Sequence, residues 1–152
     1  MKYQVILSDP PWRQRKGGTK AVRPNSSGKE LDYPVLSLGD IKEYHNKVLE
    51  LADDNHVLFL WTIEKYLRQA EDIVSELGYK LHARMIWNKV TGIPAAFTIR
   101  YGHDYLLYCY KDKLLPVALN ERGKIHSVFT EQVSRHSKKP QISYDIIERL
   151  YP

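Results

Sequence analysis

The sequence predicts an α/β domain with a mostly parallel sheet flanked by helices, and three observations support this prediction. Short apolar segments alternate with amphipathic helical segments along the chain, as in folds built from strand–helix–strand units. The first apolar segment leads directly into two prolines, which end regular structure at that point. The 152 residues, of which 43% are hydrophobic and 27% charged, are enough for one domain with a buried core.

The first half of the chain predicts two strands with a helix between them. Residues 3–7 are expected to form a strand that is buried on both faces, because Val5-Ile6-Leu7 is an uninterrupted aliphatic run. Asp40 is expected to open a helix, which residues 53–55 close. The apolar face of that helix comprises Ile41, Tyr44, Val48 and Leu51. Residues 56–62 then predict a central strand.

The second half continues the same alternation. An amphipathic helix is expected over 67–77, ended by Gly78. Further strands are expected at 79–89, 103–111 and 125–129. Pro140 marks the start of a last helix with Ile142, Ile146 and Leu150 on its inner face. Ligands in such sheets bind beyond the carboxyl ends of the strands, so the residues after the first strand are expected to lie at a site.

Residues from 13 to about 32 predict a basic, flexible loop. Between Arg13 and Lys29 the chain carries six cationic residues and no acidic one, with glycine, proline and serine interspersed. Loops of this length inside a compact domain are usually functional or disordered. The formal net charge of +5 favours an anionic partner, with nucleic acid first.

Composition also excludes several classes of protein. The single cysteine, Cys109, excludes an internal disulfide framework and a multi-cysteine zinc site, and its apolar surroundings place it in the core. The six histidines lack the spacing of a metal site, so no metal is expected. The sequence has no signal peptide and no apolar run long enough to span a membrane. We therefore expect a cytoplasmic protein without a membrane partner.

The segment Asp9-Pro10-Pro11-Trp12 has the groups needed to hold an exocyclic amine. The prolines stiffen the backbone and lack N–H groups, so the carbonyls remain free to accept hydrogen bonds. The Asp9 carboxylate and the Pro10 carbonyl can each accept one N–H of adenine N6, while Trp12 offers a flat face to the ring. Holding both N–H bonds out of the ring plane localises the nitrogen lone pair toward an electrophile. The alternative is a stiff turn with a core-packing tryptophan.

At these residues the chain resembles the MT-A70-like, S-adenosylmethionine-dependent adenine-N6 methyltransferases. The matching segments occur in the family's order: VILSDPPW at 5–12, Tyr33-Pro34, HVLFLWT at 56–62, GYKLHARMIWNK at 78–89, Arg100 with HDYLL at 103–107, and SRHSKKPQISYDIIERL at 134–150. One position departs from the pattern, since Asp104 stands where the family usually has glutamate. The resemblance implies a Rossmann-like methyltransferase fold and S-adenosyl-L-methionine as the cofactor.

The resemblance also implies roles for individual residues. Asp9 and Pro10, with Pro11, would hold the target amine, Trp12 would wall the base pocket, and Tyr33 would contact the flipped adenine. Asp9 and Lys89 would lie where cofactor and acceptor meet. Substrate contacts are expected from Arg13, Arg15 and Lys16 and from Arg135, His136, Ser137 and Lys138. The alternatives are a solvated strand end for Lys89, plain packing for Tyr33 and a surface position for His136.

The resemblance is incomplete at the C-terminal end. In this family the chain continues past Glu-Arg-Leu-x-Pro into a further strand that supplies much of the cofactor site, whereas this sequence ends at Pro152. We therefore expect a complete acceptor site and a cofactor site that further residues or a partner complete. A homodimer or a heterodimer would be consistent with that expectation.

The expected function is transfer of a methyl group to adenine N6 in nucleic acid, with DNA favoured over RNA because the sequence is short. A target base inside a duplex has to be extruded to reach such a site. The alternatives are an enzyme that acts on RNA and a non-catalytic, nucleic-acid-binding subunit of a methyltransferase complex.

Overall fold

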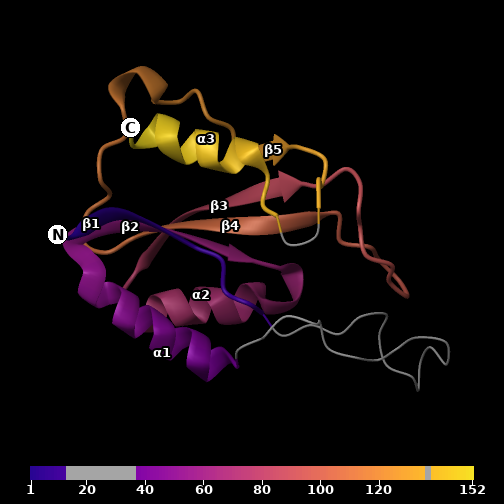
Figure 1. Cartoon of the computed structure of the whole chain (residues 1–152), viewed down its shortest axis with the longest axis horizontal. Helices are drawn as coiled ribbons and strands as arrows, with labels where there is room; N and C mark the ends of the chain where they lie inside the picture. The colour runs from indigo at the N-terminus through magenta and orange to yellow at the C-terminus, as the bar shows by residue number, and fades with distance from the viewer. Residues whose placement is uncertain (13–36, 136–137) are drawn as a thin grey trace.

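The computed structural model describes residues 1–12, 37–135 and 138–152. A five-stranded sheet lies between two helical layers, with α1 and α2 on one face and α3 on the other (Figure 1). The elements are β1 (Tyr3–Ser8), α1 (Leu38–Val48), β2 (Ala52–Thr62), α2 (Leu67–Glu76), β3 (Lys80–Asn88), β4 (His103–Tyr110), β5 (Val128–Thr130) and α3 (Gln141–Leu150). Each face of the sheet has its own hydrophobic core, and Cys109 is buried in the one beneath α1 and α2.

The sheet is mixed, so the expected mostly parallel sheet is confirmed only in part: β4 runs opposite to the other four strands. The strand order is β1-β2-β4-β3-β5; β1 and β2 are parallel, as are β3 and β5, while β4 is antiparallel to both of its neighbours. The cause lies in the connection between β3 and β4, residues 89–102, which contains no helix. A parallel pair needs a long crossover, whereas a simple loop returns the chain antiparallel. The carboxyl ends of β1, β2, β3 and β5 therefore lie at one edge of the sheet.

The expectation that the first strand is buried on both faces is also wrong. β1 is an edge strand that pairs with β2, with Val5 opposite Val57, and it has no second neighbour among the described residues. Its side chains are exposed or half-buried, and those of Tyr3 and Leu7 are exposed. Helices cover the rim of a sheet less completely than its centre, so an apolar run at the rim stays partly accessible.

Helix α1 begins earlier than Asp40. Ser37 is the N-cap, and its hydroxyl accepts a hydrogen bond from the Asp40 amide at 3.1 Å. Asp40 instead lies in the first turn, where its negative charge interacts favourably with the positive end of the helix dipole. The buried face of α1 comprises Ile41 and His45, whereas Tyr44, expected on the buried face, is exposed. A polar histidine thus takes a position that hydrophobic periodicity assigns to an apolar residue.

The remaining elements differ from the prediction mainly at their ends. β2 begins at Ala52, so residues 53–55 belong to the strand rather than closing a helix, and β5 occupies 128–130 rather than 125–129. Helix α2 ends as expected: Gly78 follows it with φ +90°, a left-handed conformation that favours glycine. Helix α3 starts directly after Pro140. In the described part of the chain, no helix is long and apolar enough to cross a membrane.

Candidate active site

Four charged side chains meet at the edge of the sheet where the parallel strands end. Asp9 follows β1, Lys89 follows β3, Asp104 is the second residue of β4, and Lys139 precedes α3. Lys89 Nζ lies 3.2 Å from Asp104 Oδ2, and Lys139 Nζ lies 3.9 Å from the same oxygen. Lys139 Nζ is also 3.7 Å from Asp9 Oδ1. Lys139 therefore lies between two carboxylates, and we call these four residues the charge cluster.

Sequence reasoning missed Lys139 and gave Asp104 no role. The sequence contained a signal for Lys139, because it is the lysine directly before Pro140 in the Lys-Pro pair at the start of the last helix. Asp104 is buried although it is charged. Buried charges require partners, and its two lysines supply them. A charged residue at the start of an otherwise apolar strand was the available signal for Asp104.

The charge cluster controls the ionisation of Asp9. Burial raises the pKa of the Asp9 carboxyl, and the nearby Asp104 charge raises it too. Lys139 opposes both effects, since its nearby ammonium group lowers the pKa of Asp9. Lys139 thus helps to keep Asp9 in the ionised form that accepts hydrogen bonds.

This balance gives a prediction for Lys139→Met. Without the ammonium group the pKa of Asp9 should rise further, because burial and Asp104 then act unopposed by Lys139. The acid limb of any activity that needs ionised Asp9 should move to higher pH, which a pH profile of kcat/KM measures. Lys124→Met is the matched control, because Lys124 is exposed and lies outside the charge cluster. An acid limb at the wild-type pH in Lys139→Met would contradict the prediction.

Trp12 anchors the Asp-Pro-Pro-Trp motif to β2. The indole Nε1 of Trp12 donates to the Trp61 carbonyl at 2.8 Å, and the ring stacks on Tyr66 at 5.5 Å between centroids. Trp12 is only 4% exposed and belongs to the core. Its expected role as a wall of a base pocket stays a prediction. The Pro10 carbonyl accepts the Trp12 amide at 2.9 Å and retains a second lone pair for another donor.

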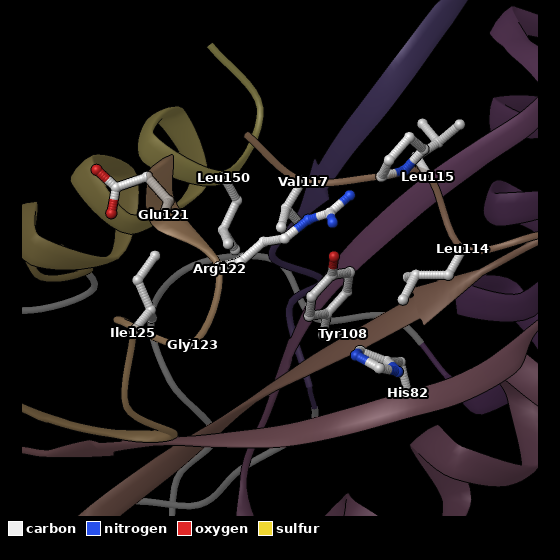
Figure 2. A pocket seen from close by; sticks show the side chains of 11 residues that line it. His82, Tyr108, Leu114, Leu115, Val117, Glu121, Arg122, Gly123, Ile125 and Leu150 are labelled. Atoms are coloured by element: carbon white, nitrogen blue, oxygen red, sulfur yellow. The ribbon is translucent and has the colours of Figure 1, made fainter. Parts of the chain in front are cut away.

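A cavity of about 470 Å³ lies next to the motif. Its walls come from β1, the motif and α1: Ser8, Asp9, Pro10 and Pro11 on one side, and Ile41, Tyr44 and Val48 on the other. This volume is in the range of pockets that hold small ligands. A second cavity, of about 330 Å³, lies over β4 on the α3 side, where the Arg122 side chain extends toward Tyr108 (Figure 2). Asp9 does not line that second cavity.

A buried histidine ties the end of β1 to α1. His45 Nδ1 donates to the Ile41 carbonyl at 2.7 Å, so Nε2 of the neutral ring accepts the Ser8 hydroxyl at 2.7 Å. Ser8 directly precedes Asp9. Burial lowers the pKa of His45 below its ordinary 6.5, with the Ile41 hydrogen bond opposing the shift. A protonated ring would lose its acceptor for Ser8.

This arrangement predicts a loss of stability in acid. As pH falls below about 6.5, His45 takes up a proton in the unfolded chain but not in the folded one, so the unfolded state gains stability. The loss continues until the pH reaches the lowered folded pKa. His45→Gln should flatten the dependence of Tm on pH between about 7 and 5. His126→Gln, at an exposed position, should leave it unchanged. The same slope in His45→Gln as in the wild type would exclude this role.

The other expected site residues divide into three groups. Lys89 contacts Asp104 and lies over the Trp87 ring, so its side chain is not freely solvated, and its expected role where cofactor and acceptor meet stays a prediction. The side chains of Arg135 and Lys138 are exposed. The remaining expected contacts lie outside the described residues: Arg13, Arg15, Lys16, Tyr33, His136 and Ser137. In the described ranges, no cluster of potential metal ligands is found.

Two buried polar atoms at the end of β2 lack partners in the described part of the chain. They are Trp61 Nε1 and Thr62 Oγ1. Lys139 Nζ lies 5.2 Å from the centre of the Trp61 ring, so this unpaired donor is near the charge cluster. Buried donors without partners are costly, and a bound ligand is one way to satisfy them.

Comparisons with known proteins give matches along almost the whole chain. The MT-A70 family profile matches residues 3–152. The chain is 23% identical over 164 residues to the type II methyltransferase M.MunI of Mycoplasma sp, covering 99% of this chain and 68% of that protein. It is 27% identical over 156 residues to the N(6)-adenosine-methyltransferase catalytic subunit METTL3 of Homo sapiens, covering 99% of this chain and 24% of that protein. It is 26% identical over 158 residues to the N(6)-adenosine-methyltransferase MT-A70-like protein of Drosophila melanogaster, covering 99% of this chain and 23% of that protein.

The chain spans most of the bacterial relative but less than a quarter of the two animal proteins. The family profile matches it from the third residue to the last, and the matched relatives are named as methyltransferases. The chain therefore belongs to the MT-A70 family of methyltransferases.

Proposed function

We propose that this chain transfers a methyl group from S-adenosyl-L-methionine to adenine N6 in nucleic acid, with DNA as the favoured substrate. The observation that carries the proposal is the position of Asp9 and Pro10 at the end of β1, beside a cavity and held by Lys139. DNA is favoured because the chain spans most of the bacterial type II methyltransferase. RNA is the alternative, since the animal relatives are named for adenosine, a ribonucleoside.

The donor set at the sheet edge fits the cofactor. S-adenosylmethionine carries a carboxylate, an ammonium group and a sulfonium, and it supplies an electrophilic methyl group. Lys139 and the unpaired Trp61 N–H fit the carboxylate, and the Asp9 carboxylate fits a cationic group.

The residues of the motif would prepare the acceptor nitrogen. Asp9 accepts one N6–H, and the second lone pair of the Pro10 carbonyl accepts the other. This holds the N6 lone pair toward the methyl group. The N6 lone pair would displace S-adenosylhomocysteine, whose sulfur keeps the electron pair of the broken sulfur–methyl bond. No strong base is required, because the N6 proton would leave to water after the new bond forms. Buried Trp12 and half-buried Tyr66 fix the position of the motif.

The test is methyl transfer from labelled S-adenosylmethionine to adenine-containing oligonucleotides of DNA and RNA, single- and double-stranded. Mass spectrometry of the nucleosides should identify N6-methylated adenine, and the better substrate decides between DNA and RNA. Binding of oligonucleotides without any transfer would contradict the proposal and favour a non-catalytic subunit. Transfer to a different atom of the base would also contradict it.

A further inference from the structure

The loop between β3 and β4 exposes a row of large apolar side chains. Phe97 is 83% exposed, Ile99 66% and Tyr101 50%. They occupy alternate positions in residues 89–102, the loop that joins the two strands. A cluster of exposed apolar side chains in a soluble domain commonly marks an interaction surface. We call these three side chains the apolar row.

The loop is internally braced. Its base is closed by a hydrogen bond from the Lys89 amide to the Gly102 carbonyl at 2.9 Å. Arg100 donates to the Ile93 carbonyl at 2.6 Å and to the Pro94 carbonyl at 3.4 Å. Val90 has φ +68°, a left-handed conformation that is strained for a β-branched residue. Strain of this kind persists where the surrounding structure enforces it. The loop that carries the apolar row therefore has a defined conformation.

The base of the loop is attached to the charge cluster. Lys89 contacts Asp104, and Lys139 connects Asp104 to Asp9. From there the loop extends beyond the edge of the sheet at which β3 ends (Figure 1). A polymer that places one unit at Asp9 would therefore pass its neighbouring units near this loop.

We propose that the apolar row binds the nucleobases that flank the target adenine, with the rings of Phe97 and Tyr101 stacking on them. The proposal rests on the proposed function, because it takes nucleic acid as the substrate. The segment 89–102 contains no acidic residue, and Arg100 has no carboxylate partner in the described part of the chain, which suits an anionic strand. Aromatic faces accept any base, and apolar side chains inserted between bases help to unstack them. An extruded adenine leaves its neighbours unstacked, and this loop would cover them.

The experiment measures oligonucleotide affinity by fluorescence anisotropy for Phe97→Ala, Tyr101→Ala and Tyr101→Phe. Each alanine variant should bind about tenfold more weakly, because one base–aromatic contact is lost. Tyr101→Phe keeps the ring and should bind like the wild type. Leu119→Ala is the matched control, since Leu119 is an exposed apolar residue at 76% in a turn that does not contact the charge cluster. DNA and RNA oligonucleotides are compared in parallel.

An abasic substitution next to the target adenine identifies the contact. It should weaken binding to the wild type but have little further effect on the Phe97→Ala or Tyr101→Ala variant that lost the same contact. Wild-type affinity in both alanine variants would overturn the proposal. Conversion of a dimer to a monomer at unchanged affinity would also overturn it and assign the row to a protein interface.

The failure of this proposal is distinguishable from failure of the proposed function. If the wild type methylates adenine and both alanine variants bind normally, only the loop proposal fails. If the wild type binds oligonucleotides through the apolar row but transfers no methyl group, only the catalytic proposal fails. At saturating oligonucleotide the alanine variants should retain transfer, because neither ring belongs to the charge cluster.

Discussion

Replacing Asp9 with alanine is expected to lower kcat for methyl transfer by about 10²–10³-fold, the loss that follows removal of one preorganised polar group from a reaction centre. In the proposed mechanism Asp9 is the charged acceptor for N6–H, whereas the other carboxylate of the charge cluster, Asp104, is buried beside Lys89 and Lys139. The effect should fall on kcat more than on oligonucleotide affinity, because phosphate and base contacts elsewhere are unchanged. Single-turnover transfer at saturating substrate measures it.

Two further variants define what Asp9 contributes. Asp9→Asn keeps an acceptor oxygen without the charge, so activity between the wild type and Asp9→Ala would separate hydrogen bonding from charge. Asp72→Ala removes an exposed carboxylate from α2 and should leave transfer unchanged. The stability of Asp9→Ala should differ from the wild type by no more than about 1 kcal/mol, because Asp9 is partly exposed. Undiminished kcat in Asp9→Ala would exclude the proposed mechanism.

Replacing Trp12 with alanine is expected to lower the free energy of unfolding by about 3–5 kcal/mol, the usual range for deleting a buried aromatic side chain. The indole is almost fully buried, stacks on Tyr66 and donates to the Trp61 carbonyl. A loss of this size is a large part of the stability of an ordinary domain. Urea unfolding at neutral pH measures it, with an unchanged m-value as the sign that the folded state stays compact.

Trp12→Phe separates packing from hydrogen bonding at this position. The phenyl ring retains most of the contact with Tyr66 but cannot donate to the Trp61 carbonyl, so a smaller loss of about 1–2 kcal/mol is expected. Leu119→Ala, at an exposed position, should be nearly neutral. If Trp12→Ala unfolded at the wild-type urea concentration, the indole would not be a core residue.

The sequence was most informative where one local rule decides the outcome. The amphipathic spacing of α2, the glycine after it and the proline before α3 predicted both helices. The orientation of β4 was not predictable in this way, because it depends on the path of residues 89–102 rather than on the composition of the strand. The prediction that β1 is buried on both faces was wrong for a related reason. Hydrophobicity indicates a strand but not whether it lies at the centre or at the edge of the sheet.

In the site, too, residues within local motifs could be predicted from the sequence, whereas residues brought together by the fold could not. Asp9, Pro10 and Lys89 are recognisable from the sequence because they belong to compact motifs. Asp104 and Lys139 acquire their importance only when the fold brings three distant segments together, and neither spacing nor composition contains those distances. Burial of His45 could not be predicted from the sequence, because it depends on the hydrogen bond to Ser8 that forms only when α1 packs on β1.

The pairing of β1 with β2 has a consequence for how this family can diversify. Val5 lies opposite Val57, so forming this pair closes a loop of about fifty residues, and residues 13–36 belong to that loop. Loop-closure entropy grows only logarithmically, by about 0.6 kcal/mol for each doubling in length. Insertions between the motif and α1 are therefore cheap in folding free energy. Evolution can lengthen or replace that segment while the sheet, and with it the geometry of the charge cluster, stays the same.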